Sequence, residues 1–118
     1  MRNKVSSYMG LAKKAGQLIS GANTCAFAMK KGKVRLIILA GDISENGEKK
    51  IMKEINRSGV KFVKYGKGDE LSRAVGSEGR SVFAVCDENF AEVIFEEIDR
   101  QRREGGIAYE DKGTGSRA

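Results

Sequence analysis

The residues best suited to bind a charged ligand are basic, and they gather in the first half of this chain. No acidic residue precedes Asp42, although eight Lys and Arg residues lie in that stretch. The first 65 residues carry 14 Lys and Arg against 4 Asp and Glu, whereas the remaining residues carry 8 against 12. Because cations without acidic neighbours attract polyanions, this charge pattern predicts a polyanionic partner for the first half.

A predicted helix that follows Gly21 carries the most informative side chains. At about 100° per residue, one side of this helix holds Asn23, Phe27, Lys30 and Lys31, with Thr24 at its edge. The opposite, inward side holds Ala22, Cys25, Ala26 and Met29. Free N–H groups at a helix start attract phosphate, an amide can bond base edges, an aromatic ring can stack on an unpaired base, and lysines neutralise the backbone. This combination predicts recognition of RNA.

Phe27 has two interpretations at this level. Its ring either stacks on an unpaired base or packs against an adjacent element of the protein. Lys30 and Lys31 lie on the same side of the helix within one turn, and lysine side chains are rarely buried. The exposed interpretation is therefore favoured, and both are kept.

Residue arrangements typical of catalysis or of metal binding are largely missing from the sequence. Without a histidine, neither a Ser-His-Asp nor a Cys-His arrangement can form. Cys25 and Cys86 belong to no CxxC pair, so we expect them to be reduced and buried rather than zinc ligands. The Gly66-Lys67-Gly68 segment lacks the rest of a P-loop and is interpreted as a turn. Asp42 and Glu45, after a buried strand, are interpreted as helix caps, and we expect no enzyme, metal or cofactor.

Short apolar segments alternate with amphipathic ones along the chain. Strands are expected at Gln17–Ser20, Val34–Ala40, Val60–Tyr65 and Ser81–Cys86. Five helices are expected. The first runs from Val5 to Gly16, the second from Asn23 to Lys31, the third from Ser44 or Asn46 to Gly59, and the fourth from Asp69 to Val75. The fifth begins at Asn89, which has capping-box spacing to Glu92. Strands that alternate with helices predict an α/β fold, here a three-layer α/β/α sandwich around a central mixed sheet of about four strands.

Length and composition predict one domain. With 118 residues, 40% of them hydrophobic, the chain can build a single core over residues 1–104, and the Gly-rich, polar residues 105–118 are expected to form a mobile tail. The longest apolar stretch, around Leu36–Ala40, is too short to cross a bilayer, and the first residues show no apolar signal region. We expect a cytoplasmic monomer without membrane contact.

Three segments resemble one known family in sequence and order. They are Leu11–Gly21, which reads LAKKAGQLISG, Lys33–Ser44, which reads KVRLIILAGDIS, and Phe83–Ala91, which reads FAVCDENFA. The chain resembles, from about Val5 to Ile98, the kink-turn-binding ribosomal protein family of the large subunit, especially its small bacterial ribosome-associated members. The resemblance implies an α/β/α sandwich that binds sharply bent RNA through the start of the second helix and the loop before the last helix.

Carried over by position, the resemblance assigns individual residues. Gly21 and Asn23 match the Gly-x-Asn of the family, which lies against the guanines of a paired G·A step. Thr24 and Phe27 stand where an acidic residue and a lysine are common. The loop before the last helix begins at Val85 and Cys86, which the resemblance places against the RNA.

We therefore expect a non-enzymatic protein that binds structured, kink-turn-like RNA, such as ribosomal RNA, and that associates with the ribosome or with translation. The predicted RNA-binding residues are Lys13, Lys14, Gly21, Asn23, Thr24, Phe27, Lys30, Lys31, Arg35, Val85 and Cys86. The main alternative is a protein-interaction adaptor on the same fold, which an exposed apolar patch would favour. A third hypothesis, the recognition domain of an RNA-modifying enzyme, would need a catalytic domain for which 118 residues leave no room.

Overall fold

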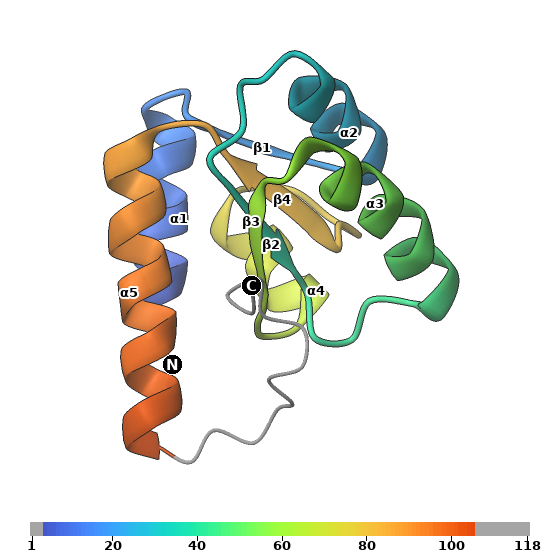
Figure 1. Cartoon of the computed structure of the whole chain (residues 1–118). Coiled ribbons are helices and arrows are strands. Elements are labelled where there is room, and N and C mark those ends of the chain that lie inside the picture. The colour runs from blue at the N-terminus through green and yellow to red at the C-terminus, as the bar shows by residue number, and fades with distance from the viewer. Residues whose placement is uncertain (1–3, 106–118) are drawn as a thin grey trace.

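A computed structural model of the chain describes residues 4–105, in which helices and strands alternate as predicted (Figure 1). The helices are α1 (Lys4–Lys14), α2 (Ala22–Lys30), α3 (Glu45–Ser58), α4 (Gly68–Ala74) and α5 (Glu88–Gly105). The strands are β1 (Leu18–Ser20), β2 (Leu36–Leu39), β3 (Lys61–Lys64) and β4 (Val82–Val85), each one or two residues shorter than predicted at most ends. The predicted tail lies outside the described residues, apart from Gly105 at the end of α5.

The four strands form one mixed sheet in the order β1-β4-β2-β3. Strand β4 pairs antiparallel with both β1 and β2, and β2 pairs parallel with β3. In the β1–β4 pair, Leu18 lies opposite Val85 and Ser20 lies opposite Phe83. The end of β1 therefore meets the start of β4, which decides which loop lies beside the start of α2.

Helices cover both faces of the sheet, so the predicted three-layer sandwich is confirmed. Figure 1 shows α1 and α5 on one side of the strands and α2 and α3 on the other. Alternate residues of β2 point into the two resulting cores, Leu36 and Ile38 toward α1, α4 and α5, and Ile37 and Leu39 toward α2 and α3. All four are fully buried, as expected for a strand covered on both faces.

Helix α3 has the ends that the sequence predicts. The Ser44 hydroxyl accepts a hydrogen bond from the Gly47 N–H at 3.0 Å, which caps the start of the helix. At the other end, Gly59 adopts a left-handed conformation with φ of 72°, which glycine reaches without a steric penalty. Asp42, interpreted as a helix cap, does accept a backbone N–H, but from Gly68 at the start of α4, at 2.9 Å.

Two predicted caps are wrong. Helix α2 begins one residue before Asn23, because Gly21 turns the chain with φ of 101° and ψ of 138°. Helix α5 begins before Asn89, because the Asp87 carboxylate accepts the Phe90 N–H at 2.9 Å and so caps the helix. A carboxylate at this position also complements the positive end of the helix dipole, which favours Asp87 over the neutral Asn89.

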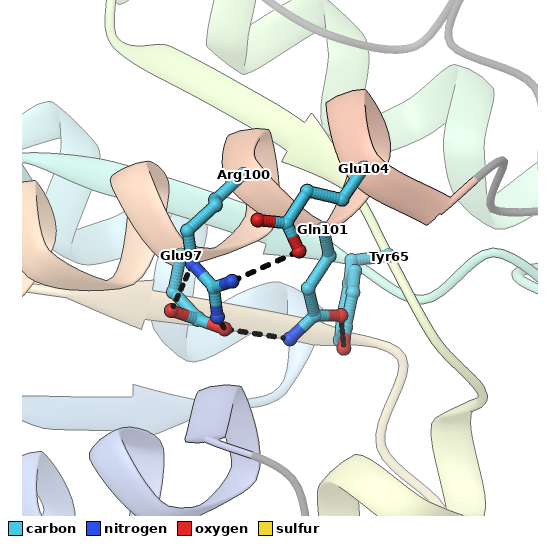
Figure 2. Close-up of polar contacts among 5 residues, drawn as sticks. All are labelled: Tyr65, Glu97, Arg100, Gln101 and Glu104. Carbon is cyan, nitrogen blue, oxygen red and sulfur yellow. Dashed lines mark hydrogen bonds and ion pairs between the residues drawn. The ribbon is translucent and has the colours of Figure 1, made fainter.

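The second half of α5 makes a polar contact with the residue that follows β3, and further polar contacts run along the helix itself (Figure 2). The Tyr65 hydroxyl, just beyond β3, donates to Gln101 Oε1 at 2.7 Å, and Gln101 Nε2 donates to Glu97 Oε2 at 3.1 Å. Arg100 bonds Glu97 and also Glu104, the latter at 3.1 Å. The hydrogen bond from Gln101 and the Arg100 guanidinium hold the pKa of the buried Glu97 below its usual range. These contacts orient a helix that extends past the end of the sheet.

Candidate nucleic-acid interface

The start of α2 is open to ligands. Gly21 is fixed on both sides, because its N–H donates to the Val82 carbonyl at 2.8 Å and its carbonyl accepts the Cys25 N–H at 2.9 Å. No side chain caps the helix, the first turn contains no acidic residue, and Asn23 and Thr24 are exposed. Uncapped N–H groups at a helix start form a site suited to phosphate or to the polar edges of bases.

Arg80, in the loop between α4 and β4, brings a positive charge to this helix start. A side-chain carbon at position 21 would lie 3.1 Å from Arg80 Nη1, so the guanidinium lies directly against the Gly21 backbone. The backbone of Arg80 is fixed by Ser72, whose hydroxyl accepts the Arg80 N–H at 2.9 Å and donates to the Arg80 carbonyl at 3.1 Å. Within residues 4–105 Arg80 forms no ion pair, so its charge is available to an anion.

Sequence reasoning missed Arg80. Arg80 reaches Gly21 because the strands at Gln17–Ser20 and Ser81–Cys86 pair antiparallel, which places the loop before the second strand beside the end of the first. Finding Arg80 from sequence would have required predicting that pairing. Ser20 Oγ and Ser77 Oγ, 3.4 Å apart, join the same loop to the end of β1. An antiparallel pair cannot be distinguished from a parallel one by hydrophobic pattern in strands as short as these.

The loop before α5 lies at the opposite end of β4 and does not approach the start of α2. The Cys86 N–H donates to the Gln17 carbonyl at 2.8 Å, at the beginning of β1. The prediction of Val85 as a contact is wrong, because its side chain is fully buried in the core beneath α1 and α5. Cys86 is half-buried and lines a hollow beside the second half of α2.

Phe27 is exposed, and the packed interpretation of its ring is wrong. The residue is 61% exposed, and Lys31 Nζ lies 4.9 Å from the ring centroid in a cation–π contact. The buried side of α2 consists of Cys25, Ala28 and Met29. Ala22, predicted to point inward, is exposed because it occupies the first position of the helix, beyond the edge of the core.

The predicted cations are separated by the fold. Lys30 Nζ lies 3.0 Å from the buried Glu54, which also pairs with Arg57, so the charge of Lys30 is only partly compensated and the contact links α2 to α3. Arg35 Nε lies 3.7 Å from Glu88 between two exposed side chains, a contact too weak to compete with a polyanion. Lys31 remains beside Phe27 and is exposed.

Lys13 and Lys14 end α1 and are exposed on another part of the surface. They line a shallow hollow between α1 and the end of α4, to which Arg73 also contributes. This hollow shares no residue with the one that Cys86 lines. The structure therefore brings together Gly21, Asn23 and Thr24 with Arg80, and Phe27 and Lys31 with Cys86, whereas Lys13 and Lys14 line a different hollow.

The two cysteine thiols are not activated as nucleophiles. Burial raises the pKa of the Cys25 thiol to about 12, and burial also raises the pKa of Cys86. Both thiols are therefore protonated at neutral pH and poor nucleophiles. Within residues 4–105, no three His, Cys, Asp or Glu side chains are grouped so that they could hold a metal ion, and no helix is long and apolar enough to span a membrane.

Comparison with known proteins gives this fold a family. Residues 3–95 match the family described as ribosomal protein L7Ae/L30e/S12e/Gadd45. The chain belongs to the L7Ae/L30e/S12e/Gadd45 family. The resemblance found in the sequence is thereby confirmed, since L7Ae-type ribosomal proteins are the kink-turn binders to which the three segments pointed.

Two curated relatives of this L7Ae-family chain are named RNA-binding protein YlxQ. That of Bacillus subtilis (strain 168) is 31% identical over 91 residues, which cover 77% of this chain and 91% of the relative. That of Enterococcus faecium is 30% identical over 98 residues, which cover 83% of this chain and 94% of the relative. The similarity thus spans nearly the whole length of both relatives.

Two solved structures share the fold. A protein of unknown function from Bacillus halodurans C superposes with a TM-score of 0.76 at 32% identity, over 83% of this chain and 99% of that one. The Giardia lamblia 15.5kD RNA binding protein superposes with a TM-score of 0.65 over 87% of this chain and 92% of that one. At 19% identity the second match supports the fold alone.

Proposed function

We propose that this L7Ae-family protein binds structured, kink-turn-like RNA at the surface formed by the start of α2 and the loop between α4 and β4. The observation that carries the proposal is the Arg80 guanidinium against Gly21, beside an uncapped helix start that exposes Asn23 and Thr24. Helix N–H groups and a guanidinium fix phosphates, and an amide side chain bonds the edges of bases. Groups that bind phosphate and a group that recognises bases therefore lie side by side in this interface.

Two further observations support RNA as the ligand. Both YlxQ relatives are named RNA-binding proteins, and the first 65 residues carry ten more Lys and Arg than Asp and Glu (14 against 4). Residues 1–104 serve as one binding domain that acts as a cytoplasmic monomer without catalysis, and ribosomal RNA or the ribosome supplies the bent RNA. Sequencing of RNA crosslinked to the protein in its own cells identifies that partner.

The adaptor alternative required an exposed apolar patch. Among the described residues, the large exposed apolar side chains are Leu11, Phe27 and Val93, which lie on three different helices. Single exposed apolar residues are ordinary on soluble proteins and do not mark a protein-binding surface. The geometry therefore favours RNA over a protein partner.

Binding of the full chain to a synthetic kink-turn RNA, compared with an unbent duplex of the same composition, tests the proposal. We expect the kink-turn to bind more tightly, and we expect Arg80→Ala and Asn23→Ala each to weaken that binding by about 1–3 kcal/mol, the range for a good side-chain contact to a base. Lys50→Ala is the matched control, because Lys50 is an exposed lysine of α3 away from this surface. Equal affinity for both RNAs, or wild-type affinity in both variants, would overturn the proposal.

A further inference from the structure

The hollow that Cys86 lines lies beside α2, about one helical turn beyond the proposed interface. It measures about 440 Å³ and is lined by Gly16, Gln17, Ile19, Thr24, Phe27, Ala28, Lys31, Lys33 and Cys86. Its volume falls in the range of about 300–1,000 Å³ that small-molecule sites occupy. Thr24 belongs to both surfaces, since it lies in the first turn of α2 and also lines the hollow. A ligand held at the helix start can therefore extend into the hollow without a break.

The ring of Phe27 forms part of the apolar lining of the hollow, together with Ile19 and Ala28. It is 61% exposed even with Lys31 over it, so ring surface remains uncovered by protein. A large aromatic side chain that is 61% exposed gains little burial from folding, and the buried residues of α2 are Cys25, Ala28 and Met29. Such a ring offers a flat surface on which a base can stack, whatever the identity of the base.

The charges around the hollow suit a phosphate. Lys31 and Lys33 line it, and neither forms an ion pair with another residue of the described part of the chain. Lys33 and Arg35 both act on the pKa of the Cys86 thiol in the lowering direction, which places two positive charges near the hollow. Burial outweighs them and raises that pKa, so the thiol stays neutral and adds no negative charge that would repel an anion.

We propose that this hollow takes one unpaired nucleotide of the bound RNA, with the base stacked on Phe27 and the phosphate between Lys31 and Lys33. Gln17 and Thr24 supply an amide and a hydroxyl for the polar edge of the base. The inference rests on the proposed function and extends it, since it adds an unpaired nucleotide to the features of the RNA that are recognised. RNA is the occupant because stacking and phosphate neutralisation combine here within one nucleotide's reach of the α2 start.

Abasic substitution measures the contribution of the proposed nucleotide to binding separately from that of the rest of the RNA. A synthetic kink-turn RNA is prepared with each unpaired nucleotide in turn replaced by an abasic ribose, and each RNA is titrated with wild-type protein, Phe27→Ala, Phe27→Leu and Phe27→Tyr. We expect one abasic position to weaken binding to the wild type by about 5- to 150-fold, the equivalent of one base–aromatic stack. Phe27→Ala and Phe27→Leu lose the same affinity for the intact RNA, and the abasic change then costs them nothing further. Phe27→Tyr keeps the ring and the dependence on that base.

Val93→Ala is the matched control, because it truncates an exposed apolar residue of a different helix, α5. This variant should bind every RNA as the wild type does. Wild-type affinity in a folded Phe27→Ala variant, or equal abasic penalties in the wild type and Phe27→Ala, would overturn the inference. Either result leaves the proposed function standing if Arg80→Ala still weakens binding. Loss of the preference for bent RNA, by contrast, removes the proposed function itself.

Discussion

At the scale of single residues, the exposure of a side chain depends on where a helix begins and on which strand carries it. Asn23 could be placed outward from sequence, and the same position was favoured for Phe27, because helical periodicity relates both to the buried Cys25 and Met29. Val85 could not be distinguished from the half-buried Cys86 that follows it, since strand pattern alone does not say where a buried strand ends. Arg80 was missed for another reason, as its partner Gly21 is distant in sequence and the two meet only through sheet pairing.

The exposure of Phe27 makes its contribution to stability testable. Because the ring is largely in water, Phe27→Ala should change the free energy of unfolding by no more than about 0.5 kcal/mol. A buried phenylalanine would instead cost about 3–5 kcal/mol. Urea unfolding followed by circular dichroism distinguishes the two values, and a loss in the larger range would contradict the exposed position.

Phe27→Lys restores the residue that is common in the resembled family. The variant should fold, because a lysine on this exposed side of α2 meets solvent. Its affinity for a kink-turn RNA should fall, as for Phe27→Leu, because lysine removes the ring on which the base stacks. A folded variant that binds more tightly than the wild type would mean that a lysine at this position, as in the resembled family, is worth more than the stack, and it would contradict the proposed role of the ring.

The two cysteines should respond differently to truncation. Cys25 is fully buried and its thiol has a pKa of about 12, whereas Cys86 is only half-buried, against the prediction that both are buried. We expect Cys25→Ala to lower the free energy of unfolding by about 0.5–1.5 kcal/mol, as for the loss of one buried heavy atom, and Cys86→Ala to cost less. Urea unfolding measures both. Loss of RNA affinity in a folded Cys25→Ala variant would contradict a purely structural role.

At the scale of elements, local signals fixed the positions of the helices and strands better than their partners. Ser44 and Gly59 delimit α3 because capping and left-handed turns are decided by a few adjacent residues. The strand order β1-β4-β2-β3 and the register of β1 against β4 depend on contacts between distant segments, which residue pattern does not encode. The position of the candidate site followed from that register, so it could be predicted only in part.

Helices α2 and α3 are joined by an ion cluster that the sequence did not indicate. Glu54 of α3 is buried and accepts hydrogen bonds from Lys30 of α2 and from Arg57. Those hydrogen bonds, that of Lys30 first, hold the pKa of Glu54 below its usual range. The cluster fixes α2, and with it the exposed groups of the proposed interface, against the rest of the fold.

Glu54 should make stability depend on pH in the acidic range. Its folded pKa lies below the value of about 4.3 for an unfolded glutamate. The stabilisation is therefore complete above about pH 4.3 and is lost as the pH falls through the folded pKa. Thermal unfolding between pH 3 and 7 should show a shallower acid decline for Glu54→Gln than for the wild type, while the exposed control Glu96→Gln follows the wild type. Equal slopes in all three proteins would contradict this role.

At the scale of the whole molecule, exposed positive charge lies in two hollows rather than at one binding site. Lys13 and Lys14 lie with Arg73 in a hollow between α1 and α4, which shares no residue with the hollow at α2. Composition predicted an excess of positive charge in the first half of the chain, and only the fold divides it between two surfaces. A bent RNA has two arms, which allows one molecule to reach both.

The salt dependence of binding decides whether Lys13 and Lys14 contact the RNA. Each phosphate that a protein cation neutralises adds about 0.7–0.9 to the slope of log affinity against log salt. The double variant Lys13→Ala/Lys14→Ala should therefore lower the slope magnitude by about 1.4–1.8 if both lysines bind phosphates. The matched control is Lys49→Ala/Lys50→Ala, an adjacent exposed pair on α3, which removes the same net charge and should leave the slope unchanged. Equal slopes in both double variants would mean that the α1 lysines act on the RNA only through the net charge of the protein. The RNA contacts would then be confined to α2 and the Arg80 loop.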